Sequence, residues 1–152
     1  MPLRRRLGSL KETNVTDPDL TVGAVLTDDL RDWLMAGLRY PVIAVIAEDG
    51  SPSQSVMWFD LDPEDPNVIV MNTKRGRAKD RWLRHDPRIS LCFEEGMRWA
   101  AFKGQVTIDD DRERAMESIR SLAHRYGADP DRYAGQERVI LRFRPEKVIR
   151  HD

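Results

Sequence analysis

Cysteine and long apolar runs are nearly absent from this chain of 152 residues. Cys92 is the only cysteine, which excludes an internal disulfide and a cluster of thiolate metal ligands. No apolar run approaches the length of about 20 residues that a membrane-spanning helix needs. Arg4, Arg5 and Arg6 stand near the start, but no apolar stretch of a secretory signal follows them. We therefore expect a cytoplasmic protein that does not bind membranes.

An excess of charge of either sign is also absent. The chain has 25 Lys and Arg against 26 Asp and Glu, so its net charge creates no field that would attract nucleic acid. We expect no nucleic-acid partner, and any anion site must be local. The Walker pattern, the G-x-G-x-x-G pattern and the G-x-S-x-G elbow are missing. His85, His124 and His151 stand far apart without paired carboxylates, so no metal site is predicted.

The length fits a single domain. Residues 1–25 mix charged residues, proline and glycine without periodicity, which predicts an extended or mobile N-terminal extension that could clasp a partner subunit. Residues 26–152 are expected to form the folded domain. Thr27 is placed to cap a first short helix.

Short apolar segments separated by turns dominate the rest of the chain. Helical spacing is found at 78–85 and at about 110–126. Strands are expected at 42–47, 55–59, 68–71, 88–93, 99–108 and 138–144. In the last strand, apolar residues alternate with arginines, which predicts one buried face and one basic face. Six strands joined mainly by hairpins, with a few peripheral helices, favour an antiparallel barrel of the α+β class that is mainly β.

A basic segment at 72–81 carries the clearest chemical signal. It packs five cationic side chains around Gly76 at the start of a helix: Lys74, Arg75, Arg77, Lys79 and Arg81. The unpaired N–H groups and the dipole of a helix N-terminus favour anions, and Gly76 permits close approach of the backbone to a phosphate. The alternative is a solvent-exposed basic helix face, which is what most charged segments of this kind form.

Two blocks of this sequence resemble the pyridoxamine-phosphate-oxidase-like split β-barrels. The first is the hairpin of residues 42–47, 48–52 and 55–60, and the second comprises 72–73, 76–81 and 85–91. The flavin- and deazaflavin-dependent oxidoreductases, and among them the B group that uses coenzyme F420, are the most similar branch. This resemblance implies a six-stranded split β-barrel that forms a homodimer, with the cofactor sites at the subunit interface.

The resemblance also assigns roles to residues. It implies that Ser55, Val56 and Met57 line the cofactor ring, that Asn72 and Thr73 lie near the ribityl chain, and that Arg77 and Lys79 hold phosphate. Trp58 is a candidate for stacking on a planar ligand. Lys74, Arg75 and Arg81, with Gly76 between them, would form a rim for the anionic tail of F420. No catalytic residue is recognisable.

Two departures from the family pattern bear on function. Trp82 stands where relatives often have asparagine, and the closing segment with which pyridoxamine-phosphate oxidases grip their substrate does not follow Val148. Vitamin B6 oxidation is accordingly disfavoured. We expect an oxidoreductase that transfers hydride from F420 to a planar or unsaturated small molecule. The alternatives are an FMN-dependent oxidoreductase of the same fold and a non-catalytic flavin- or haem-binding protein.

Overall fold

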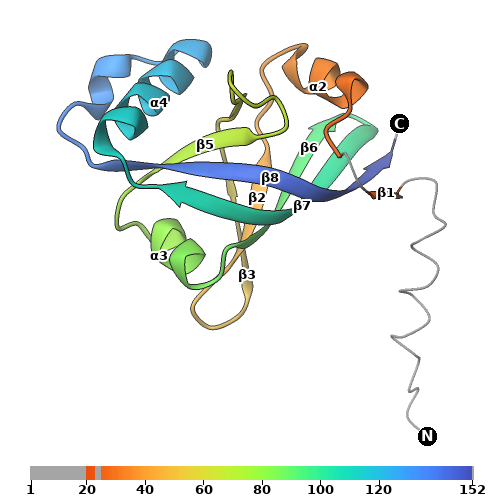
Figure 1. Ribbon diagram of the computed structural model, residues 1–152, viewed down its shortest axis with the longest axis horizontal. Coiled ribbons are helices and arrows are strands. Elements are labelled where there is room, and N and C mark those ends of the chain that lie inside the picture. The colour runs from red at the N-terminus through yellow and green to blue at the C-terminus, as the bar shows by residue number, and fades with distance from the viewer. Residues whose placement is uncertain (1–19, 23–24, 152) are drawn as a thin grey trace, which may run out of the picture.

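In the computed structural model, residues 20–22 and 25–151 are described, and within them eight strands form one antiparallel sheet (Figure 1). The strands are β1 (Leu20–Val22), β2 (Val42–Ile46), β3 (Pro52–Val56), β4 (Asp60–Leu61), β5 (Ile69–Lys74), β6 (Arg88–Glu95), β7 (Arg98–Asp109) and β8 (Arg138–His151). The helices are α2 (Asp28–Met35), α3 (Ala78–His85) and α4 (Arg112–Arg125), with a short 3-10 helix, η1 (Pro130–Tyr133). The predicted mainly-β α+β class is confirmed, although the predicted number of six strands is too low.

The sheet curls into a barrel. Its hydrogen-bonded order is β3-β2-β6-β7-β8-β5-β4, so β3 and β4 are its two edges. In a flat sheet these edges would lie about 29 Å apart, because neighbouring strands are spaced by about 4.8 Å. Only residues 57–59 connect β3 to β4, and such a link reaches at most about 15 Å between Val56 and Asp60. The sheet must therefore bend until its edges approach each other.

The barrel interior is filled by large apolar side chains. Phe93 packs edge-on against both Phe59 and Phe102, with ring centroids 4.8 Å and 5.8 Å apart. These three rings and Phe143 are almost fully buried. They come from β6, β7, β8 and the link between β3 and β4, so the core joins strands that are distant in the sequence.

Three expectations about the strands need correction. The strand predicted at 55–59 ends at Val56, because Met57, Trp58 and Phe59 form the link between the edges instead of pairing. The strand predicted at 68–71 continues to Lys74, because β5 pairs with β8 up to that residue. Within the N-terminal extension, residues 20–22 form β1 and pair with β8, whereas residues 1–19 lie outside the described part.

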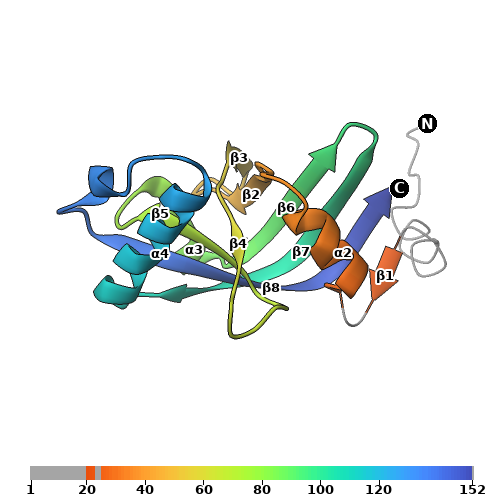
Figure 2. The same cartoon turned by 90° about the horizontal axis from the view of Figure 1, so that it is seen from above.

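The helices lie outside the sheet. Thr27 caps α2 as predicted, since its Oγ1 accepts a hydrogen bond from Leu30 N at 3.3 Å. Helix α4 packs on β5 and β8 and contacts η1, whereas α3 lies near β2 and β5. Figure 2 shows α4 and α2 at opposite ends of the sheet. The face of β5 that meets α4, and the adjoining start of α3, enclose the largest cavity described below.

In the described part of the chain, no helix is long and apolar enough to cross a membrane.

Candidate functional site

A cavity of about 480 Å³ lies among β5, the start of α3, α4 and the segment that follows β3. Its walls are formed by Val56, Met57, Trp58, Asn72, Thr73, Arg77, Lys79, Ile119, Leu122, Ala128, Arg132, Tyr133, Gln136 and Arg138. We call it the cationic pocket. Its size falls within the range of about 300–1,000 Å³ that is usual for cofactor and small-molecule sites.

The charges that line this pocket all have one sign. Four of its lining residues are cationic, namely Arg77, Lys79, Arg132 and Arg138, and none of the lining residues is an aspartate or glutamate. Arg77 and Arg132 are exposed, Lys79 is half-buried and Arg138 is buried. Cations gathered without a carboxylate repel one another, and a bound anion removes that repulsion. The pocket is therefore suited to an anionic ligand.

The effect of a pocket lining without carboxylates is clearest at Lys79. Its Nζ donates to Met57 Sδ at 2.8 Å, a weak acceptor that does not neutralise the charge. Burial of the amine, with a further contribution from the nearby Arg77 charge, lowers the pKa of Lys79 to about 8. A negatively charged group in the pocket would restore the protonated form.

Arg138 is held in place by three neighbours. Its Nε donates to Asn72 Oδ1 at 2.9 Å, and its Nη1 donates to Gln136 Oε1 at 2.9 Å. The guanidinium also lies over the Tyr133 ring at 5.2 Å. Burial, and then the Arg77 charge, lower the pKa of Arg138. Asn72 in turn donates to Ala115 O at 2.9 Å and so connects β5 to α4.

The turn before α3 positions Arg77 and Lys79. Gly76 adopts a φ of +83°, a conformation that other residues rarely take, and its N–H donates to Asp80 Oδ2 at 2.8 Å. Arg77 follows as the N-cap residue of α3, with no side-chain hydrogen bond to the helix. The side chain of Asp80 thus holds the turn, while Arg77 and Lys79 line the pocket.

Trp58 is part of an aromatic group at the pocket wall. Its ring stacks on Tyr126 with centroids 5.2 Å apart and an interplanar angle of 9°. The Tyr126 hydroxyl donates to Arg39 O at 2.5 Å. One face of the Trp58 ring is therefore already covered by protein.

Most of the sequence-predicted site residues meet at this pocket. Seven of them line it: Val56, Met57, Trp58, Asn72, Thr73, Arg77 and Lys79. Ser55 lines a neighbouring hollow of about 310 Å³ that shares Thr73, Arg77 and Lys79.

Lys74, Arg75 and Gly76 line neither of these two cavities. Lys74 is the last residue of β5, and its side chain is exposed. Arg75 is paired with Asp110 at 2.9 Å and with Glu137 at 3.8 Å. Arg81, the third residue of the predicted rim, donates to Gly76 O and lines a separate hollow near Trp82.

Sequence reasoning missed the part of the pocket that follows β7. Ile119 and Leu122 come from α4, and Ala128, Arg132, Tyr133, Gln136 and Arg138 come from the residues after it. The alternation in the last strand predicted that Arg138 would face solvent, but the side chain is buried. In the sequence, α4 has only the spacing of an ordinary amphipathic helix, and an arginine at the start of β8 does not by itself indicate a binding site.

Comparison with known proteins places the chain in a family. Residues 26–152 match the family model of pyridoxamine 5'-phosphate oxidase. The conserved hypothetical protein Rv2991 from Mycobacterium tuberculosis has a similar structure, with a TM-score of 0.71, 24% identity, and coverage of 89% of this chain and 88% of that one.

Two further structures share the fold. An F420 reductase has a TM-score of 0.64 and 24% identity, with coverage of 77% of this chain and 94% of the reductase. A putative pyridoxamine 5'-phosphate oxidase from Listeria innocua has a TM-score of 0.59 and 16% identity, with coverage of 78% and 95%. Because the family match spans most of the sequence and includes the elements that form the cationic pocket, this chain belongs to the pyridoxamine 5'-phosphate oxidase family.

Proposed function

We propose that the chain is an oxidoreductase that binds coenzyme F420 in the cationic pocket and transfers hydride to a planar or unsaturated small molecule. The observation that carries this proposal is the set of four cations, with no carboxylate, lining a cavity of cofactor size. FMN is the alternative cofactor, because its phosphate also requires cationic side chains.

The residues of the pocket fit a ligand with one anionic and one apolar part. Arg77, Lys79 and Arg138 would hold a phosphate, because arginine offers paired donors and lysine a point charge. Val56 and Met57, which line the same cavity, would contact the ring. When bound, the cofactor supplies the hydride chemistry, and the protein supplies orientation and a local positive field.

The choice of F420 over FMN is supported by resemblance. The sequence blocks that include Gly76 and Arg77 are similar to those of the F420-using group, and an F420 reductase shares the fold. The rim proposed for the F420 tail now depends on the exposed Lys74 alone, because Arg75 and Arg81 have partners within the protein.

A homodimer would complete the pocket. Val56 lines it and yet is 62% exposed. Among the described residues, β3 pairs only with β2, so its other edge offers free backbone groups. An unpaired edge of this kind can pair with another chain. We propose that the second subunit covers this edge and contributes to the ring side of the site.

The test is a binding titration. F420 and FMN are added separately to the purified protein, and binding is followed by quenching of cofactor fluorescence. Lys79→Ala should weaken binding of the preferred cofactor, because the variant removes a cation from the pocket. Lys103→Ala, which removes an exposed lysine from β7, is the matched control and should bind like the wild type.

The outcomes separate the parts of the proposal. A wild-type protein that binds neither cofactor would refute the redox assignment. Equal binding by the wild type and Lys79→Ala would show that the phosphate lies elsewhere. Tight binding without turnover with any electron donor or acceptor would favour the non-catalytic alternative.

A further inference from the structure

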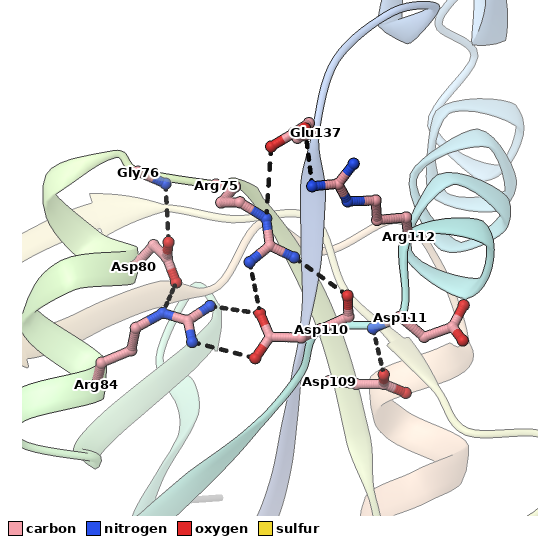
Figure 3. Close-up of polar contacts among 9 residues, drawn as sticks. All are labelled: Arg75, Gly76, Asp80, Arg84, Asp109, Asp110, Asp111, Arg112 and Glu137. Atoms are coloured by element: carbon pink, nitrogen blue, oxygen red, sulfur yellow. Dashed lines mark hydrogen bonds and ion pairs between the residues drawn. The ribbon is translucent and has the colours of Figure 1, made fainter.

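A network of ion pairs connects α3 to the start of α4 and to the residue before β8, three elements that contribute residues to the cationic pocket (Figure 3). Arg84 is its centre. The Nε of Arg84 donates to Asp80 Oδ1 at 2.9 Å, and its two Nη atoms donate to the two oxygens of Asp110 at 2.6 and 3.1 Å. Figure 3 shows α3 on one side of this network and the start of α4 on the other, with the start of β8 between them. None of these three residues lines the pocket.

On the α3 side, the network ends at a buried carboxylate. The side chain of Asp80 is only 3% exposed, and it holds both Arg84 and the N–H of Gly76. A buried carboxylate that loses a charged partner is strongly disfavoured, so Asp80 cannot release Arg84 without rearranging. Such a rearrangement would move the turn that carries Arg77 and the helix that carries Lys79.

On the other side, the network holds the junction between β7 and α4. Asp110 follows the last residue of β7, and Asp111 is the N-cap residue of α4. Arg75 reinforces the junction by donating to both the carboxylate and the carbonyl oxygen of Asp110, at 2.9 and 3.1 Å. From this junction, α4 carries Ile119 and Leu122 to the pocket.

The same network reaches the start of β8. Glu137 lies 3.8 Å from Arg75 and 3.1 Å from Arg112, the first residue of α4. The N–H of Arg75 also donates to Glu137 O at 2.8 Å. Glu137 directly precedes Arg138, the buried cation of the pocket. The contacts therefore connect α3, α4 and the start of β8, three of the elements that line the pocket.

We propose that Arg84 is a positioning residue that sets the spacing between the α3 wall and the α4–β8 wall of the cationic pocket. This inference takes the identity of the ligand from the proposed function, whereas the positioning role of Arg84 follows from the ion-pair geometry alone. Only a planar guanidinium can bind Asp80 through Nε while it binds Asp110 through both Nη atoms. Lysine has the same charge but a single nitrogen, so it cannot bridge the two carboxylates in this manner.

The test compares Arg84→Lys with Arg88→Lys. Arg88 is the matched control, because it also forms a close ion pair, with Asp86 at 2.7 Å, but connects only residues two positions apart. Two quantities are measured for each protein: affinity for F420 and FMN by fluorescence quenching, and the pKa of Lys79 from its side-chain NMR signals. The second measurement needs no ligand and reports directly on how the α3 wall is seated.

We expect Arg84→Lys to weaken binding of the preferred cofactor by about three- to thirtyfold, the usual range for residues that act through a network. We also expect the pKa of Lys79 to rise from about 8 towards its ordinary value of 10.5, because a displaced wall admits water. Arg88→Lys should change neither quantity.

An Arg84→Lys protein with the wild-type pKa of Lys79 would overturn the inference, as would equal effects of both variants. If the wild type binds neither cofactor, the proposed function fails, while the NMR titration still decides the positioning role. Should Arg84→Lys not fold, Asp110→Asn weakens the same bridge from its exposed side and is judged by the same two measurements.

Discussion

Lys79 Nζ lies 2.8 Å from Met57 Sδ, so that an amine at the start of α3 meets the segment linking the two edges of the sheet. The contact places the charge of Lys79 against an apolar wall instead of a carboxylate. This single relationship links the fold to the proposed chemistry, since the residues come together only when the sheet is curled.

The first prediction concerns the pH dependence of anion binding. The pKa of Lys79 is lowered to about 8, first by burial and then by Arg77, so the amine loses its proton above that pH in the free protein. Because an anion requires the protonated form, affinity should fall by up to tenfold per pH unit above about 8, with proton uptake on binding. Isothermal titration calorimetry in buffers of different ionisation enthalpy measures this uptake.

The control for this prediction is Lys79→Arg. Arginine stays protonated throughout the accessible range, so the inflection near pH 8 should disappear. The free energy of unfolding should depend on pH in the opposite sense to the affinity for the anion. Between about 8 and the ordinary 10.5, the unfolded chain holds the proton and the folded protein does not, so this group makes the fold more stable as pH rises. Affinity that is constant from pH 7 to 9 would contradict the assignment.

The second prediction concerns Asn72, which joins β5, α4 and β8. Asn72→Ala removes the acceptor for Arg138 Nε and the donor to Ala115 O, and leaves both groups buried without that partner. We expect the free energy of unfolding in urea to fall by about 1–3 kcal/mol. The control is Asn67, whose exposed side chain accepts only a solvent-exposed hydrogen bond from Arg31 Nη1 at 3.0 Å among the contacts of the described residues, and Asn67→Ala should change stability by less than about 0.5 kcal/mol. Equal losses in the two variants would argue against a central role for Asn72.

The third prediction concerns a close approach between β7 and β8. A Cβ on Gly104 would lie 3.0 Å from Arg144 O and 3.2 Å from Glu146 N, at the point where the register between these strands shifts. Gly104→Ala should destabilise the fold by about 1–3 kcal/mol, because backbone cannot move aside as a flexible side chain does. A Cβ on Gly37 would have no such neighbour within 4 Å, so Gly37→Ala should be tolerated. Thermal unfolding distinguishes the two variants.

The fourth prediction tests the proposed dimer. In light scattering, the wild type should have twice the chain mass of 17.6 kDa. Val56→Glu places a charge on the exposed edge strand β3 and should produce a monomer without unfolding the domain. Met97→Glu, which adds the same charge at the more exposed turn between β6 and β7, should remain dimeric. A monomeric wild type would contradict the proposal, because no second subunit would then contribute to the ring side of the pocket.

Part of the fold could be predicted because the signals are local. The Thr27 cap and the helical and strand spacings each act within a few residues, and the helix at 78–85 and the strand that begins at residue 88 lie where the sequence indicates. The basic segment is local too, which is why the sequence, together with its family resemblance, indicated Arg77 and Lys79.

The rest could not be predicted because it depends on pairing over long sequence distances. Asn72 pairs with Ile140 across β5 and β8, and this register buries Arg138 although the alternation of β8 indicated an exposed side chain. Similarly, Arg75 has the composition of an anion ligand, but folding brings Asp110 to it from 35 residues away and engages its charge.

By itself, the sequence determined that this chain forms short antiparallel strands with a basic turn leading into a helix, because periodicity, caps and turn residues act on neighbours. Tertiary structure alone decided which cations share one cavity and which are neutralised elsewhere. Whether an arginine binds a ligand or a carboxylate depends on what the fold brings within a few ångströms, and that distance is set by strand register and barrel closure.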